Sequence, residues 1–215
     1  QDRLLSLPEN KKFAEVQDPH KAPWSFAPVN PEAFEFVTEL VDELAASTPS
    51  PFFHIGGDES WDVGEGVSKA AVKELGVGKV HADYYTRLVN YIKKKHDRRT
   101  MLYGDMLLKY PEALEDLAKE SIIVDWHYNA SKEGGYPSVE TIRKAGFENI
   151  FVSPGIWGWA NFYPNDGMGF RNVGEFVMAG KRHGAMGSIT SSWGDRGAEN
   201  LRVNNWHSYA FSAAV

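Results

Sequence analysis

Two adjacent acids, Asp58 and Glu59, are the residues of this sequence best placed to do chemistry. They follow a short apolar run at 52–55 and two glycines, Gly56 and Gly57. Neighbouring residues on a strand point to opposite faces, so the two acids can share a pocket only where the strand ends and the chain turns. Glycine tolerates the backbone conformations that such a turn requires. The segment therefore predicts a paired-carboxylate site at a strand end.

Two carboxyl groups held this close have a chemical consequence. Because two anions repel, one of the pair tends to remain protonated near neutral pH. The pair would then offer a general acid beside a charged group that stabilises developing positive charge. Capping of the next helix is the commoner use of an Asp-Glu pair after a strand, and residue types alone leave that alternative open. The preceding His-Ile-Gly-Gly favours the catalytic interpretation.

The elements that must position these acids alternate along the chain. The apolar strand segments show little polar alternation, which is typical of strands buried on both faces of a parallel sheet. This rhythm predicts an α/β fold, either a doubly wound open sheet or a (β/α) barrel. No glycine-rich phosphate-binding motif follows any strand, so a nucleotide-binding version has no support. We predict strands at 52–55, 100–106, 121–128, 149–156 and 187–193, and helices at 8–16, 31–46, 81–98, 110–119, 138–146, 172–183 and 203–215.

Acids and tryptophans gather at the predicted strand ends, where functional groups lie in both architectures. Indoles stack on the apolar faces of sugars and carboxylates accept their hydroxyl hydrogen bonds, so such a ring is what a sugar pocket requires. His54, on the first predicted strand, either holds the strand end or contacts substrate. The other candidate residues at strand ends are Tyr103, Asp105, Trp126, Trp157, Trp193 and Asp195.

Composition removes several other classes of function. The 215 residues include no Cys, which excludes a disulfide scaffold, a thiolate zinc site and a Cys nucleophile. The net charge of -6 argues against a nucleic-acid surface. No apolar run approaches the ~18 residues of a membrane span. His54 and Asp58 could bind a metal by residue type, but no second His pair with ligand spacing supports this, so we expect no metal and no cofactor.

The segment 54–59 resembles the His-x-Gly-Gly-Asp-Glu signature of glycoside hydrolase family 20, the β-N-acetylhexosaminidases, at all six positions. The similarity continues through most of the chain and looks most like the branch of hexosaminidase D-like enzymes. It implies a (β/α)8 TIM barrel in which this motif ends strand four. Residues 1–215 would then supply about strands four to eight with their helices, as the C-terminal portion of a single catalytic domain. Another chain or segment would complete the barrel.

The resemblance also implies an activity, the removal of terminal β-linked N-acetylhexosamine from glycans or glycoconjugates. Glu59 would be the general acid and base, and Asp58 would orient the substrate's 2-acetamido group, which itself attacks the anomeric carbon. Configuration is retained, and the expected partner is a carbohydrate, with no nucleic acid, membrane or cofactor.

Further roles follow from the same resemblance. Trp126 and Trp193 match pocket-wall aromatics on strands six and eight, and Tyr103 stands where many members have Trp. Asp195 takes the place of a Glu that binds distal hydroxyls and is shorter by one methylene. Trp157 either lines a leaving-group subsite or packs a loop.

Two roles for Asp105 and two alternative functions stay open. Asp105 could accept a sugar hydroxyl or hold a neighbouring residue. Paired with Glu59, it could also make the protein a different retaining barrel glycosidase. The second alternative function is that of a sugar-binding protein that has lost catalysis. The intact Asp58-Glu59 pair argues against it.

Overall fold

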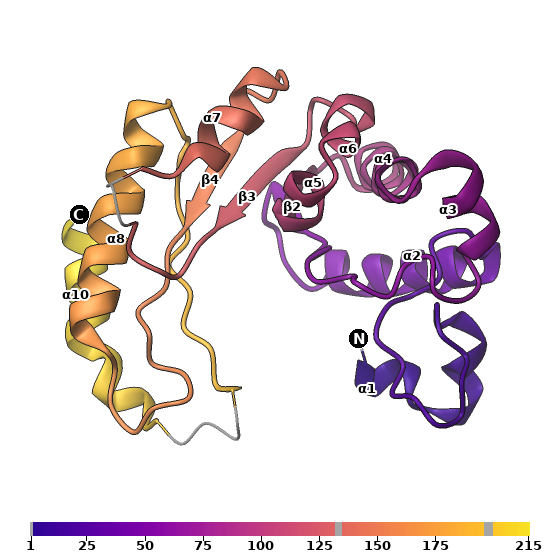
Figure 1. Cartoon of the computed structure of the whole chain (residues 1–215), viewed down its shortest axis with the longest axis horizontal. Helices are drawn as coiled ribbons and strands as arrows, with labels where there is room; N and C mark the ends of the chain where they lie inside the picture. Colours follow the sequence, from indigo (N-terminus) through magenta and orange to yellow (C-terminus); the bar gives the residue numbers. More distant parts are fainter. Residues whose placement is uncertain (1, 132–134, 196–199) are drawn as a thin grey trace. The chain divides into compact units, whose positions relative to one another are not determined.

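The computed structural model describes residues 2–131, 135–195 and 200–215 (Figure 1). The chain divides into two compact units, Gln1–Ser121 and Ile122–Val215, and each is described by itself. Within the described ranges, no helix combines the length and the apolar character needed to cross a membrane.

The first unit contains two parallel strands with helices before and after them. Phe53 pairs with Thr100 and His54 with Met101, so the two strands run in the same direction. The long helix between them makes the connection that parallel strands require. The elements are α1 (Asp2–Leu5), the 3-10 helix η1 (Pro8–Phe13), α2 (Pro31–Ala46), β1 (Phe52–His54), α3 (Lys69–Leu75), α4 (Val77–His96), β2 (Arg99–Tyr103), α5 (Asp105–Lys109) and α6 (Pro111–Asp116).

Helix α2 begins where the sequence predicts it. The Asn30 side chain accepts hydrogen bonds from the N–H groups of Glu32 at 2.9 Å and Ala33 at 3.3 Å. Pro31 occupies the first turn, where its missing N–H costs nothing. The predicted helix at 31–46 is therefore confirmed at both ends.

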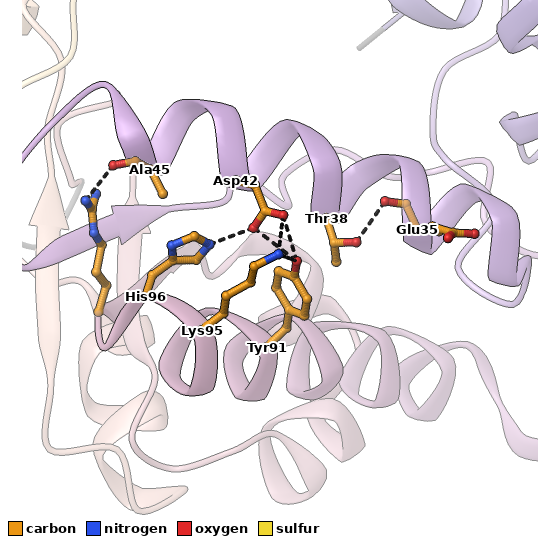
Figure 2. A network of polar contacts seen from close by, with 8 residues as sticks. Glu35, Thr38, Asp42, Ala45, Tyr91, Lys95 and His96 are labelled. Atoms are coloured by element: carbon orange, nitrogen blue, oxygen red, sulfur yellow. Dashed lines mark hydrogen bonds and ion pairs between the residues drawn. The ribbon is translucent and has the colours of Figure 1, made fainter.

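Helices α2 and α4 pack against β1 through an apolar cluster that includes Val41, Phe53 and Ile92. A polar network joins the same two helices further along (Figure 2). Asp42 accepts hydrogen bonds from the Tyr91 hydroxyl at 3.0 and 2.9 Å and from the Lys95 ammonium at 2.6 Å.

His96, the last residue of α4, completes this network, because its Nε2 lies 2.7 Å from Asp42 Oδ1. Both helices end just before a strand begins, so the network lies towards the amino ends of β1 and β2. In barrel folds that edge serves stability, whereas the opposite edge carries the chemistry.

The second unit contains three parallel strands. Val124 pairs with Phe151, and Phe151 pairs with Gly187. Helices α8 and α10 lie side by side (Figure 1). The elements are β3 (Ile122–Trp126), α7 (Pro137–Lys144), β4 (Ile150–Ser153), α8 (Asp166–Arg182), β5 (Gly187–Ser188), the 3-10 helix η2 (Arg202–Asn205) and α10 (Trp206–Ala214).

Strand β3 shows the burial that its composition predicts. Ile122, Ile123 and Val124 are consecutive, point alternately to opposite faces, and are all fully buried. Both faces of β3 are therefore covered, as in the interior of a parallel α/β sheet.

Several predicted boundaries are wrong. The strand predicted at 100–106 ends at Tyr103, because α5 begins at Asp105. The strand predicted at 187–193 is regular only at Gly187–Ser188, and beyond it Ser191 makes one isolated bridge with Gly155.

The helices differ as well. Helix α8 begins at Asp166, six residues before the predicted start at 172, because glycines in its first turns hide the apolar period. Helix α3, which has no buried residue, was not predicted. The predicted helix at 203–215 is a 3-10 turn followed by α10. The predicted helix at 8–16 is the 3-10 helix η1.

Candidate functional site

The chain turns sharply after β1, where the sequence predicts that it must. Gly56 and Gly57 have φ angles of +72° and +90°, and Glu59 has a φ of +52°. A side chain at positive φ is uncommon and costs free energy, and such residues gather at active sites. Glu59 is therefore held in a strained backbone conformation by its surroundings.

Residues of helix α4 form hydrogen bonds with this turn. The buried Tyr85 hydroxyl donates a hydrogen bond to the Gly57 carbonyl at 2.8 Å. A Cβ atom added at Gly57 would lie 3.3 Å from ring carbons of Tyr85, a tight contact that adds to the preference for glycine set by φ. Ser60 Oγ lies 2.9 Å from Nε2 of the buried His81. Burial lowers the pKa of His81 and raises that of Tyr85, so both groups are neutral at pH 7.

The peptide groups of Glu59 are held from two other segments. Its N–H donates a hydrogen bond at 2.9 Å to Oδ2 of Asp105, which is the first residue of α5. Its carbonyl accepts a hydrogen bond from the Trp24 indole at 2.5 Å. These contacts fix the main chain that carries the candidate acid.

Asp58 is half-buried and lines a cavity of about 210 Å³. Apolar side chains of α2, β1 and α4, among them Val41, Phe53 and Leu88, line the same cavity. Burial raises the pKa of Asp58 above its ordinary value. The sequence predicts that one of the paired acids has a raised pKa through mutual repulsion, and the structure instead gives burial as the cause.

His54 acts on the same turn. Its Nδ1 accepts the Gly56 N–H at 3.0 Å, and its ring centroid lies 4.5 Å from that of Tyr103. Loss of hydration lowers the pKa of His54 to about 4, so its ring is neutral at pH 7. A neutral ring can accept at Nδ1, and this bond supports the strand end, while substrate contact by His54 stays a prediction.

The first unit thus brings together all of its candidate residues. The Tyr103 N–H donates to the Gly56 carbonyl at 2.9 Å, which ties the end of β2 to the turn. Asp105 holds the neighbouring Glu59, one of the two roles left open. The five residues gathered at this strand end are His54, Asp58, Glu59, Tyr103 and Asp105.

The candidate tryptophans of the second unit gather around Tyr128. Trp126 stacks on Tyr128 with ring centroids 5.1 Å apart. The Trp193 indole donates to the Tyr128 hydroxyl at 2.9 Å, and the Trp157 indole donates to its carbonyl. Trp157 also stacks on Trp159 at 5.0 Å. We call these five residues the aromatic cluster, and four of them, all but Trp193, line a cavity of about 490 Å³.

Asp195 lies next to this cluster and is exposed. With Trp159, Trp193 and Arg202 it lines a second cavity of about 320 Å³ in the same unit. Over the described ranges 2–131, 135–195 and 200–215, no group of three or more His, Asp or Glu side chains could hold a metal ion.

Sequence reasoning missed two of these contacts. Tyr128 follows Trp126 by two positions, and this spacing along an extended segment could have pointed to it. Trp24 lies in a proline-rich loop, where no periodic pattern indicates which residue contacts the turn.

Comparisons with known proteins agree with this geometry. The model of the glycosyl hydrolase family 20 catalytic domain matches residues 3–159. A beta-hexosaminidase of Porphyromonas gingivalis is 25% identical over 139 residues, which are 62% of this chain and 16% of that protein. The chain therefore belongs to glycosyl hydrolase family 20.

Solved structures show the fold. The beta-N-acetylhexosaminidase of Bacteroides fragilis matches 98% of this chain with a TM-score of 0.67 and 16% identity. A GH20 catalytic module of the pneumococcal exo-beta-D-N-acetylglucosaminidase matches 100% of it with a TM-score of 0.61 and 16% identity. The chain is part of a TIM barrel, and it covers 44% and 54% of those two chains.

Proposed function

We propose that the protein containing this chain hydrolyses terminal β-linked N-acetylhexosaminides with retention of configuration. The observation that carries this proposal is the turn after β1, in which Glu59 is held at positive φ directly after the half-buried Asp58. A helix cap would need neither the strain nor the contacts from Trp24 and Asp105. Membership of glycosyl hydrolase family 20 and the named activities of its similar proteins support the same reaction.

In the first step, Glu59 donates its proton to the glycosidic oxygen as the bond from that oxygen to the anomeric carbon breaks. The carbonyl oxygen of the 2-acetamido group bonds to the anomeric carbon and forms an oxazolinium ring. Asp58 accepts the acetamido N–H and stabilises the positive charge that develops. The substrate thus supplies the nucleophile that other retaining glycosidases take from a second carboxylate.

In the second step, Glu59 takes a proton from a water molecule, whose oxygen attacks the anomeric carbon. The ring opens, and N-acetylhexosamine leaves with its β configuration. Asp105 is not needed as a nucleophile in this scheme, because the acetamido group takes that part, and its carboxylate instead accepts the Glu59 N–H.

We further propose that the aromatic cluster stacks on carbohydrate. Indole and phenol rings with polar edges suit sugar faces, and Trp126, Tyr128 and Trp157 already line one cavity. Asp195 would contact hydroxyl groups from the adjoining cavity. Since the chain covers less than two thirds of its similar proteins, we propose that residues 1–215 are the C-terminal portion of one catalytic domain, completed by another segment or chain.

The test is hydrolysis of a chromogenic N-acetyl-β-glucosaminide by the full-length protein and its Glu59→Gln variant. We expect turnover by the wild type, inhibition by a thiazoline that mimics the oxazolinium ring, and near-complete loss in Glu59→Gln. Turnover without thiazoline inhibition would favour a glycosidase that uses a second carboxylate. Sugar binding without any turnover would favour a binding protein.

A further inference from the structure

The loop that follows Glu59 is anchored by a buried acid far away in sequence. Glu15 is fully buried, and its Oε1 accepts the backbone N–H groups of Gly64 at 3.1 Å, Gly66 at 3.1 Å and Ser68 at 2.9 Å. Its Oε2 accepts the Ser68 hydroxyl at 2.7 Å. A buried carboxylate is tolerated only with such compensation, and four donors supply it here.

The main chain of the segment at 14–25, which includes Glu15, is also in close contact with the main chain of the loop at 60–68. The Val67 N–H donates to the Glu15 carbonyl at 2.9 Å, and the Glu15 N–H donates to the Ser25 carbonyl at 2.8 Å. A Cβ atom at Gly66 would lie 1.9 Å from the Glu15 carbonyl oxygen, so only glycine fits there. The loop at 60–68 is thus pressed against the segment at 14–25.

These two segments meet a second time at Glu59 itself. The Trp24 indole donates to the Glu59 carbonyl at 2.5 Å, and the Ser25 N–H donates to Asp62 Oδ2 at 3.2 Å. One end of the 14–25 segment therefore holds the far end of the loop, and its other end holds the residue proposed as the acid. Loss of the Glu15 carboxylate would leave three backbone N–H groups, that of the buried Ser68 among them, without their acceptor and would release both contacts.

We propose that Glu15 is a positioning residue that acts through the 60–68 loop and Trp24 to aim the Glu59 carboxyl at the leaving oxygen. The proposal rests on the proposed function of Glu59. It assigns to Glu15 a role in protonation of the leaving group and none in sugar binding, since its carboxylate is enclosed by protein donors. The expected effect is therefore on kcat/KM, which reports the first step, and it grows with the leaving group's demand for a proton.

The test compares two aryl N-acetyl-β-glucosaminides with the full-length protein. A 2,4-dinitrophenyl leaving group departs without protonation, whereas a phenyl leaving group needs the acid. We expect Glu15→Ala to lower kcat/KM, which reports the first step alone, by about 100-fold on the phenyl substrate and by less than about 3-fold on the dinitrophenyl substrate, since small misplacements have effects of that size where the acid is needed. Glu15→Gln keeps an acceptor for the three N–H groups and should restore most of the rate.

The control is Glu39→Gln, which neutralises an exposed acid on α2 and should leave both rates unchanged. If Glu15→Ala does not fold, Ser68→Ala removes only the 2.7 Å bond to Glu15 and should show the same selectivity at about 5-fold. Equal losses on both substrates, or no loss, would overturn the role of Glu15. A wild-type protein inactive on both substrates would instead overturn the proposed function, and the role of Glu15 with it.

Discussion

The carboxylate of Asp105 accepts a hydrogen bond from the backbone N–H of Glu59 at 2.9 Å. Glu59 belongs to the turn after β1, and Asp105 opens the helix after β2, so the bond joins the carboxyl ends of neighbouring parallel strands. It holds Glu59 at a φ of +52°, a conformation that a free chain would leave. The backbone of the acid proposed for catalysis is thus held by the carboxylate of a second acid.

Replacement of Asp105 should therefore impair catalysis more than binding. We expect Asp105→Ala to lower kcat about 10- to 100-fold with little change in KM, because the Glu59 backbone can relax away from the strained angle. Asp105→Asn keeps an oxygen that can accept the N–H and should recover most of the rate. Steady-state kinetics of the wild type, Asp105→Ala and Asp105→Asn measure kcat and KM separately and test this. A large rise in KM in both variants would show that Asp105 binds the sugar instead.

A side chain at Gly57 should be unfavourable for two separable reasons. Its φ of +90° strains any other residue, and a Cβ would lie 3.3 Å from the Tyr85 ring. Gly76 is the matched control, because it has a φ of +86° but open space around its Cβ position. We expect both alanine variants to lose about 1–3 kcal/mol of stability in urea denaturation.

Only Gly57→Ala should also lose activity, by about tenfold or more, because the added methyl group displaces the turn that carries Asp58 and Glu59. An active Gly57→Ala variant would show that the turn need not be held so closely.

The sequence foretells those features that rest on local chemistry. Asn30 and Pro31 predict the start of α2, and three consecutive apolar residues predict the buried strand β3. Gly56 and Gly57 predict the turn. The bond between Glu59 and Asp105 could not be predicted, because it joins residues 46 positions apart and depends on the register of two strands.

The support from Glu15 and Trp24 is hidden for the same reason. Both lie in irregular segments, where no periodic pattern shows which side chains contact another part of the chain. The extent of β5 was overestimated because an apolar run fixes neither hydrogen bonding nor the length of pairing.

Tyr128 organises the aromatic cluster, so its hydroxyl should matter for substrate binding. Tyr128→Phe removes the acceptor of the Trp193 indole N–H at 2.9 Å but keeps the stacked ring. We expect KM to rise about 3- to 10-fold with kcat nearly unchanged, which matches the loss of one hydrogen bond. Tyr163→Phe, at an exposed position, is the control and should leave KM unchanged. An unaltered KM in Tyr128→Phe would mean that the placement of Trp193 does not depend on this bond.

Asp42 should contribute to the stability of the folded protein and should have no effect on the rate of the reaction. Burial alone would raise its pKa, but hydrogen bonds from Lys95, His96 and Tyr91 outweigh burial and lower it (Figure 2). Because the pKa of Asp42 is lower in the folded protein than in the unfolded one, the charged carboxylate stabilises the fold. This stabilisation is complete above the pKa of the unfolded state, near 4, and is lost as the pH falls through the pKa of the folded state.

We expect Asp42→Asn to lower the free energy of unfolding by about 1–2 kcal/mol at pH 7, with a difference from the wild type that shrinks as the pH falls through the lowered pKa of Asp42, and unchanged kcat. Urea denaturation at several pH values measures this. A difference between wild type and variant that did not depend on pH would exclude the charge of Asp42 as its source.

The central claim is that the substrate's own acetamido group attacks the anomeric carbon, with Asp58 as its partner and Glu59 as the acid. The most direct measurement compares turnover of 4-nitrophenyl N-acetyl-β-glucosaminide with that of the matching 2-hydroxy glucoside, in the full-length protein and in Asp58→Asn. We predict turnover of the acetamido substrate alone, and a loss of about 100-fold or more in Asp58→Asn. Equal turnover of the two substrates by the wild type would contradict the claim.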